Sequence, residues 1–165
     1  MTRPEVGEAA PDFELRDEHG QLAALSTHRG RRAVLLVFYP YAFSRVCTSE
    51  LGALRDAWSD LGRDDLAVLA VSCDPVFTLR AYAEAEQLPF ALLSDFWPHG
   101  EVSRVYGAFD EVHGCAVRSS YLVDEEGTVR WSVHRPAGQG RDPAEYVAAL
   151  GPLRAEDHHG PRRRS

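Results

Sequence analysis

Cys47 is the residue whose type and position most strongly predict chemistry. It follows the apolar run 33–39 and lies in the first turn of a helix expected over residues 44–61. A cysteine in that position faces unpaired backbone N–H groups and the positive end of the helix dipole, and both favour the thiolate over the thiol. Because the thiolate is the nucleophilic form of the side chain, the sequence predicts a nucleophile at Cys47.

Ser44 and Pro40 both precede Cys47 in the chain, and their residue types suit the same site. Ser44 lies three positions earlier, near the expected N-cap, so its hydroxyl is expected to cap the helix or to donate to a reacting oxygen, and the two roles are compatible. Pro40 lacks an N–H and ends the preceding strand, so it either closes one side of a pocket or simply terminates the strand. Pro40 and Ser44 are therefore candidate site residues.

Two charged residues are candidates from further along the chain. Arg118 lies on a strand expected inside the sheet, where an unpaired cation is costly, so it needs an anionic partner. The Cys47 thiolate would be a natural partner, and an exposed position on the sheet is the alternative. Glu50 follows Cys47 by three residues, within one helical turn, and is expected to hold an arginine such as Arg118 in place.

The composition predicts one domain without a general affinity for polyanions. The chain has 165 residues, 44% of them hydrophobic, and a formal net charge of −7, which disfavours nucleic acid and anionic membrane surfaces as partners. It has no lysine, which excludes Schiff-base chemistry on a lysine side chain. Three cysteines without a CxxC pair, and an N-terminal segment without an apolar stretch, predict reduced thiols in a cytoplasmic protein.

Hydrophobic periodicity and turn residues predict an alternating order of strands and helices. The expected elements are an N-terminal hairpin (6–15 and 21–25), strands at 33–39, 66–72, 90–93, 117–123 and 128–133, and helices at 44–61, 75–87, 102–106 and 143–150. Asp74 is expected to cap the helix that Pro75 opens. This order indicates an α/β fold with a thioredoxin-like mixed sheet flanked by helices and an N-terminal β-hairpin extension. The domain is expected over 1–155, and the polar tail 156–165 is expected to be disordered.

Pro40, Ser44 and Cys47 fit the pattern Pro-x3-Thr/Ser-x2-Cys, and in this respect the chain resembles the peroxiredoxins, which are thiol peroxidases. The run 92–100, the Tyr106-Gly107 pair with Phe109, and the strand 118–124 are similar to the alkyl hydroperoxide reductase E group of actinobacteria. The resemblance covers about residues 5–150 and leaves the C-terminal tail outside.

The resemblance implies that the Cys47 thiolate attacks the terminal oxygen of a peroxide and becomes a sulfenic acid. Hydrogen peroxide, organic hydroperoxides and peroxynitrite are the implied substrates, without metal, haem or flavin. Negative charge grows on the leaving oxygen, so fixed hydrogen-bond donors lower the barrier. The expected donors are the Ser44 hydroxyl, the Arg118 guanidinium and the backbone N–H groups near Val46 and Cys47.

A sulfenic acid must be reduced before the next turnover. Neither Cys73 nor Cys115 lies where the larger peroxiredoxin groups have a resolving cysteine, so a one-cysteine cycle is expected, and Cys115 is the better alternative of the two. The resemblance implies an external reductant such as mycothiol with a mycoredoxin, or another glutaredoxin- or thioredoxin-like protein. A non-catalytic redox sensor and a thiol-disulfide oxidoreductase are rival interpretations; the latter is disfavoured because CxxC is absent.

Relatives of this kind commonly form dimers, and the resemblance therefore implies a homodimer. The apolar residues Phe43, Phe96 and Trp97 are a candidate patch for the contact.

Overall fold

The computed structural model describes residues 2–62 and 64–159 of the chain. Among these residues, seven strands form one sheet in the order β2-β1-β5-β4-β3-β8-β9. The strands are β1 (Glu14–Asp17), β2 (Leu22–Ala24), β3 (Ala33–Phe38), β4 (Leu66–Ser72), β5 (Ala91–Ser94), β8 (Arg118–Val123) and β9 (Val129–Arg135). Strands β3, β4 and β5 run parallel to one another, whereas β8 pairs antiparallel with β3. The sheet is therefore mixed, as predicted.

Strand β3 lies at the centre of the sheet because its sequence is apolar on both faces. All six of its residues are buried, and it pairs with β4 on one side and β8 on the other. Its alternate residues enter two separate hydrophobic clusters: Leu35 and Val37 join one, and Leu36 and Phe38 join the other. A strand that is covered on both faces in this way is held rigidly, and its C-terminal end leads directly into the segment that carries Cys47.

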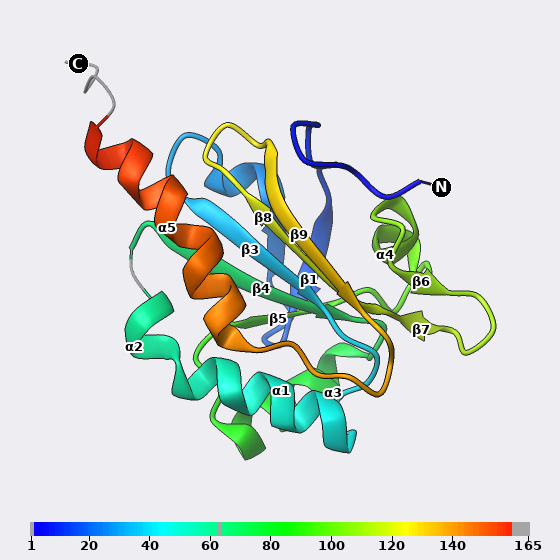
Figure 1. Ribbon diagram of the computed structural model, residues 1–165. Helices are drawn as coiled ribbons and strands as arrows, with labels where there is room; N and C mark the ends of the chain where they lie inside the picture. The colour runs from blue at the N-terminus through cyan, green and yellow to red at the C-terminus, as the bar shows by residue number, and fades with distance from the viewer. Residues whose placement is uncertain (1, 63, 160–165) are drawn as a thin grey trace.

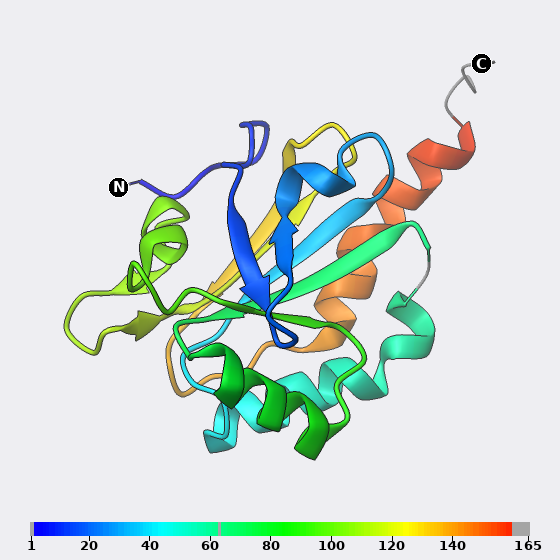
Figure 2. The same cartoon turned by 180° about the vertical axis from the view of Figure 1, so that it is seen from behind.

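Helices cover both faces of the sheet (Figures 1 and 2). One cluster contains side chains of α1 (Arg45–Asp56), α2 (Trp58–Leu61), α3 (Val76–Glu86) and α5 (Pro143–His159). The other cluster contains side chains of the N-terminal segment, the 3-10 turn η1 (Leu25–His28) and α4 (Glu101–Val105). Figure 1 shows α5 crossing the near side of the sheet, and Figure 2, seen from behind, shows the edge strands β1 and β2 of the sheet nearer the viewer.

The predicted N-terminal hairpin is present, and it is part of the main sheet. Strands β1 and β2 pair antiparallel, and β1 also pairs with β5 at Arg16–Ser94 and Asp17–Leu93. The predicted hairpin of β8 and β9 is present as well, joined through a turn at residues 124–128. Both hairpins were signalled by turn residues between short apolar strands, which is a local feature of the sequence.

Several element boundaries differ from the prediction. The helix expected over 44–61 is two helices, because at Ala57 the ψ angle of 6° interrupts α1 before Trp58 begins α2. The small two-stranded sheet of β6 (Phe109–Asp110) and β7 (Cys115–Ala116) was not predicted. The last helix, expected to end at residue 150, extends to 159 and includes residues assigned to the tail, while residues 160–165 lie outside the described part of the chain.

No helix in the described part of the chain is long and apolar enough to span a membrane. All three cysteines are free thiols and all are buried.

Candidate active site

Cys47 is the third residue of α1, the position that the sequence predicts. The helix begins at Arg45, Ser44 is its N-cap residue, and the first helical hydrogen bond runs from Thr48 N–H to the Ser44 carbonyl at 2.9 Å. The Cys47 side chain is fully buried and belongs to the cluster between α1 and the sheet. The thiol therefore combines a helix N-terminus with a site from which bulk water is excluded.

Arg118 is the charged group that contacts this thiol. Its Nη2 lies 3.3 Å from Cys47 Sγ, and its side chain is only 3% exposed. Arg118 is the first residue of β8, and its Nε donates to the Ala137 carbonyl at 2.8 Å. The structure thus brings this buried arginine and Cys47 together. A guanidinium at hydrogen-bond distance stabilises negative charge on the sulfur.

Glu50 holds Arg118 in place, as the spacing within α1 predicts. Arg118 Nη1 donates to Glu50 Oε1 at 2.8 Å, and both side chains are 3% exposed. The same carboxylate also accepts three hydrogen bonds from Arg141: Nη2 at 2.6 Å, Nε at 2.8 Å and the backbone N–H at 2.7 Å. One carboxylate thus joins two buried arginines, and only Arg118 reaches the thiol.

Burial alone would raise the pKa of Glu50, because it penalises the charged form. The hydrogen bonds and the positive charge of Arg141, with a smaller contribution from the charge of Arg118, outweigh this effect of burial and hold the pKa of Glu50 below its ordinary value. Glu50 is therefore an anion at neutral pH. Arg141 is anchored further by Ser120 Oγ at 2.8 Å, and Ser120 in turn bonds Tyr146 of α5 at 2.9 Å.

Ser44 occupies the N-cap position, but its hydroxyl does not cap the helix. It donates instead to the Tyr41 carbonyl at 2.8 Å, and no side-chain cap bond is formed. The prediction that the Ser44 hydroxyl caps the helix was therefore wrong, whereas the predicted position of Ser44 at the N-cap was right. The hydroxyl closes a turn ahead of α1, where Phe43 has a φ angle of +68°. Pro40 is buried and precedes this turn, two residues after the end of β3.

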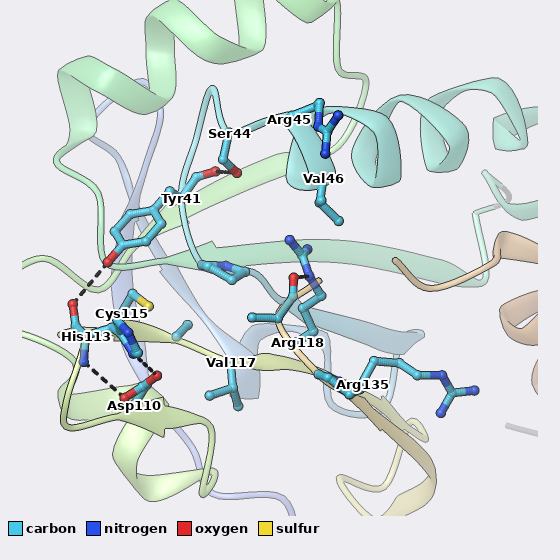
Figure 3. Close-up of a pocket in the computed structure, with 14 residues that line it drawn as sticks. Tyr41, Ser44, Arg45, Val46, Asp110, His113, Cys115, Val117, Arg118 and Arg135 are labelled. Carbon is cyan, nitrogen blue, oxygen red and sulfur yellow. Dashed lines mark hydrogen bonds and ion pairs between the residues drawn. The ribbon is translucent and has the colours of Figure 1, made fainter. Parts of the chain in front are cut away.

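A cavity of about 450 Å³ opens beside this turn (Figure 3). Its lining residues come from the loop before α1 and the first turn of α1, from the β6–β7 hairpin and the start of β8, and from the end of β9 with the segment after it: Pro40, Tyr41, Ser44, Arg45, Val46, Asp110, His113, Cys115, Ala116, Val117, Arg118, Arg135, Pro136 and Ala137. Since Arg118 contacts the thiol and Val46 precedes it in the chain, Cys47 lies directly behind the cavity wall. Three of the four predicted site residues, Pro40, Ser44 and Arg118, line the cavity.

Cys115 lies at one end of this cavity. Figure 3 shows it beside Tyr41, with His113 and Asp110 close by and Arg135 at the opposite end. Tyr41 Oη donates to the His113 carbonyl at 3.0 Å, which ties the small β6–β7 hairpin to the loop before α1. Burial raises the pKa of the Cys115 thiol, although a hydrogen bond with Tyr41 opposes the rise. The thiol is therefore less ionised than an ordinary cysteine at the same pH.

Cys73 lies at the end of β4, outside the residues that line the cavity. Burial raises its pKa to about 12, with a further contribution from the charge of Asp95. It is 7% exposed and belongs to the core, which agrees with its interpretation as a buried structural thiol.

The profile of the AhpC/TSA family matches residues 6–132 of this chain. The chain is a peroxiredoxin of the AhpC/TSA family. It is accordingly a thiol-dependent peroxidase, and the resemblance stated from the sequence is confirmed.

Individual relatives place the peroxiredoxin within the family. It is 45% identical over 150 residues to alkyl hydroperoxide reductase E of Mycobacterium tuberculosis (strain H37Rv), an alignment that covers 91% of this chain and 98% of that protein. It is 31% identical over 151 residues to a peroxiredoxin of Thermoplasma volcanium, covering 88% of this chain and 72% of the relative. The peroxiredoxin is thus of the alkyl hydroperoxide reductase E type.

Solved structures confirm the thioredoxin-like fold of the peroxiredoxin. The crystal structure of Enterococcus faecalis AhpC superposes with a TM-score of 0.85 at 27% identity, covering 98% of this chain and 99% of the other. That of the peroxidoxin BcpB from Mycobacterium tuberculosis gives 0.80 at 28% identity, covering 93% and 98% of the two chains.

The sequence analysis missed Arg141, which gives Glu50 three of the hydrogen bonds in the peroxiredoxin's buried network. This arginine follows a Gly-rich segment, and its partner Glu50 is 91 residues away in the chain. Its neighbours were interpreted only as the start of the last helix. The sequence held one indication of a further partner. A Glu50 carboxylate that pairs with Arg118 alone has oxygen lone pairs left without a hydrogen-bond donor.

Proposed function

We propose that this peroxiredoxin follows a one-cysteine cycle in which Cys47 is the nucleophile and an external thiol is the reductant. The observation that carries the proposal is the 3.3 Å contact between Arg118 Nη2 and Cys47 Sγ in a buried site at a helix N-terminus. Arg118 also lines the cavity, so it can face both the sulfur and an incoming peroxide. This geometry supports transition-state stabilisation as well as thiolate formation.

The proposed step forms one bond and breaks one. The Cys47 thiolate attacks the terminal oxygen of the peroxide, a sulfur–oxygen bond forms, and the oxygen–oxygen bond breaks. Both electrons of that bond pass to the leaving oxygen, which takes up a proton and departs as water or an alcohol, or departs as nitrite when the substrate is peroxynitrite. The attacked oxygen keeps its hydrogen, so that the sulfur becomes a sulfenic acid.

Arg118 and Ser44 are the proposed donors to the peroxide oxygens, and Pro40 closes one side of the pocket. Hydrogen peroxide, organic hydroperoxides and peroxynitrite are the proposed substrates. The similar mycobacterial protein is named for reducing alkyl hydroperoxides, and the cavity of about 450 Å³ has room for an organic group. No metal, haem or flavin enters the proposed cycle.

The sulfenic acid is proposed to react with an external thiol, which releases water and leaves a mixed disulfide. A second thiol then exchanges with this disulfide and restores Cys47. Mycothiol with a mycoredoxin, or another glutaredoxin- or thioredoxin-like protein, is the proposed source. The raised pKa values of Cys73 and Cys115 support an external reductant, because a thiol that stays protonated attacks slowly.

One observation favours a second candidate, a two-cysteine cycle resolved by Cys115. This residue lines the same cavity as Ser44 and Val46, the neighbours of Cys47 in the chain. An internal disulfide would then replace the mixed one, with release of one water molecule.

Whole-protein mass spectrometry after one equivalent of peroxide tests both cycles. The one-cysteine cycle predicts a gain of one oxygen atom, trapped by a sulfenic acid reagent, in the wild type and in Cys115→Ser. The Cys115 cycle instead predicts a loss of two hydrogen atoms in the wild type and sulfenic acid only in Cys115→Ser. Cys47→Ser is the control. If Cys47→Ser were oxidised as fast as the wild type, Cys47 would not be the nucleophile.

The protein is further proposed to form a homodimer and to act in the cytoplasm. Large apolar side chains are exposed just before α1, at Phe43 (53%), and on α3 and the segment after β5, at Phe77 (84%), Phe96 (46%) and Trp97 (82%). Burial of these side chains by a second copy would remove them from water. A reducing compartment suits a chain whose three cysteines are free. A monomer in sedimentation at micromolar concentration would refute the dimer.

A further inference from the structure

The Asp74 carboxylate has a different partner from the one that its sequence context predicts. Helix α3 begins at Val76, its N-cap residue is Pro75, and no side chain caps it. Asp74 Oδ2 instead accepts the backbone N–H of Ala42 at 2.8 Å, from a segment 32 residues away. The predicted cap was therefore wrong, and the carboxylate binds the loop that precedes the Cys47 helix.

The bound loop has a conformation that is unfavourable by itself. Phe43 has a φ angle of +68°, in the left-handed region that residues with a Cβ rarely adopt. The turn is closed by Ser44, whose hydroxyl and N–H both donate to the Tyr41 carbonyl, at 2.8 and 3.4 Å. Such a strained turn persists only where its surroundings restrain it. The bond from Ala42 to Asp74 is one such restraint.

Asp74 is itself fixed to two central strands. Its Oδ2 accepts the Ser72 hydroxyl at 2.7 Å, and Ser72 is fully buried at the end of β4. The Asp74 carbonyl accepts the Ser94 hydroxyl of β5 at 2.6 Å. The carboxylate therefore connects the rigid part of the sheet to the loop, and the loop leads into α1 at Ser44.

We propose that Asp74 is a positioning residue for peroxide reduction, which holds the loop 40–44 so that Pro40 and Ser44 keep their places around Cys47. It acts through the Ala42 N–H and does not touch the substrate. The inference rests on the proposed role of Cys47 as the nucleophile. It predicts that the loss of the carboxylate slows the reaction with peroxide more than it slows other reactions of the same thiol.

The test compares Asp74→Ala with Asp74→Asn in the full chain. Alanine removes the acceptor, and asparagine keeps a side-chain oxygen that can accept the Ala42 N–H. A hydrogen bond to a charged group corresponds to roughly a tenfold effect or more, so we expect Asp74→Ala to lower the second-order rate constant with hydrogen peroxide about tenfold. Asp74→Asn should restore the rate to within about threefold of the wild type. Asp17→Ala is the matched control, since Asp17 accepts two backbone N–H groups within the β1–β2 turn and none from the loop 40–44.

The rate at which iodoacetamide alkylates Cys47 distinguishes a loss of positioning around the thiol from a general disruption of the site. Alkylation needs the thiolate but no donors to a peroxide, so Asp74→Ala should be alkylated at close to the wild-type rate. The inference is overturned if Asp74→Ala reacts with peroxide within twofold of the wild type, if alkylation slows by the same factor, or if Asp74→Asn is as slow as Asp74→Ala.

Hydrogen exchange keeps the test decisive if Asp74→Ala does not fold. The Ala42 amide of the wild type should then be protected, and its exchange should accelerate about tenfold in Asp74→Asn, whose neutral oxygen is the weaker acceptor. An unprotected Ala42 amide in the wild type would overturn the inference. Failure of the proposed function looks different, because the wild type itself would then be slow with peroxide or Cys47→Ser would still react.

Discussion

Replacement of Glu50 by glutamine changes the one carboxylate that joins the two buried arginines. Glu50 accepts four hydrogen bonds, one from Arg118 and three from Arg141, divided equally between its two oxygens. The amide of glutamine keeps one oxygen and replaces the other with a donor group. Two of the four bonds therefore become donor-to-donor contacts, whichever way the amide is turned.

The cost of this change is large because the site is buried. Both arginines would lose their anion while their side chains are 3% and 0% exposed. Breaking a buried ion pair by removing one charge costs about 3–5 kcal/mol, so we expect the free energy of unfolding of Glu50→Gln to fall by about that amount. We also expect Arg118, now held mainly by the Ala137 carbonyl, to be aimed less well at Cys47, which should lower the rate of peroxide oxidation roughly tenfold.

Two measurements check this prediction, with a matched control. Urea unfolding gives the free energy of unfolding, and stopped-flow fluorescence gives the rate with hydrogen peroxide. Glu84→Gln removes the carboxylate of an exposed pair with Arg80, whose side chains are 72% and 61% exposed, and should change stability by less than about 1 kcal/mol. If Glu50→Gln were as stable as Glu84→Gln and reacted as fast with hydrogen peroxide, the argument that the buried network supports stability and positions Arg118 would be refuted.

Three further predictions concern the same site and its surroundings. Arg118→Lys should slow peroxide oxidation about a hundredfold in stopped-flow kinetics, because an ammonium cannot reach Cys47, Glu50 and a carbonyl together as the guanidinium fork does. Cys73, with a pKa raised to about 12, should resist iodoacetamide at pH 8 in the native protein and react in urea; rapid native labelling would contradict its burial. The folded-state pKa of Glu50 lies below its ordinary value. The stability that the Glu50 carboxylate contributes should therefore be present above its unfolded-state pKa and be lost as the pH falls through its folded-state pKa. In an acid titration of the free energy of unfolding, Glu50→Gln should not show this loss of stability.

Features that depend on neighbouring residues could be predicted from the sequence. The apolar run of β3 indicates a strand buried on both faces, and the turn residues between β8 and β9 indicate a hairpin. The spacing between Ser44 and Cys47 gives their positions at the start of α1, because three residues always separate the N-cap from the third helical residue. The pairing of Arg118 with Cys47 followed from the cost of burying an unpaired cation.

Contacts between distant segments could not be predicted from spacing. Ser44 was expected to cap α1 and Asp74 to cap α3, and both side chains instead bind the turn at 41–44. Local propensity favours a cap for either residue, but the tertiary structure offers each a different backbone partner. Arg141 was missed for the same reason, since its bonds to Glu50 arise only when the segment after β9 packs against α1.

The carboxylates of Glu50 and Asp74 restrain two different neighbours of the nucleophile, Arg118 and the turn 41–44. Glu50 lies one turn after Cys47 and fixes the arginine that contacts the sulfur, whereas Asp74 fixes the turn that precedes the helix. Each is a fixed acceptor, and neither is placed to remove a proton from the thiol, since Glu50 is surrounded by arginine donors. The groups that can stabilise negative charge on the sulfur are the helix N-terminus and Arg118, and the carboxylates determine how accurately those groups are aimed. Replacement of either carboxylate should therefore change the rate of the reaction with peroxide, and no new basic group should appear in the dependence of that rate on pH.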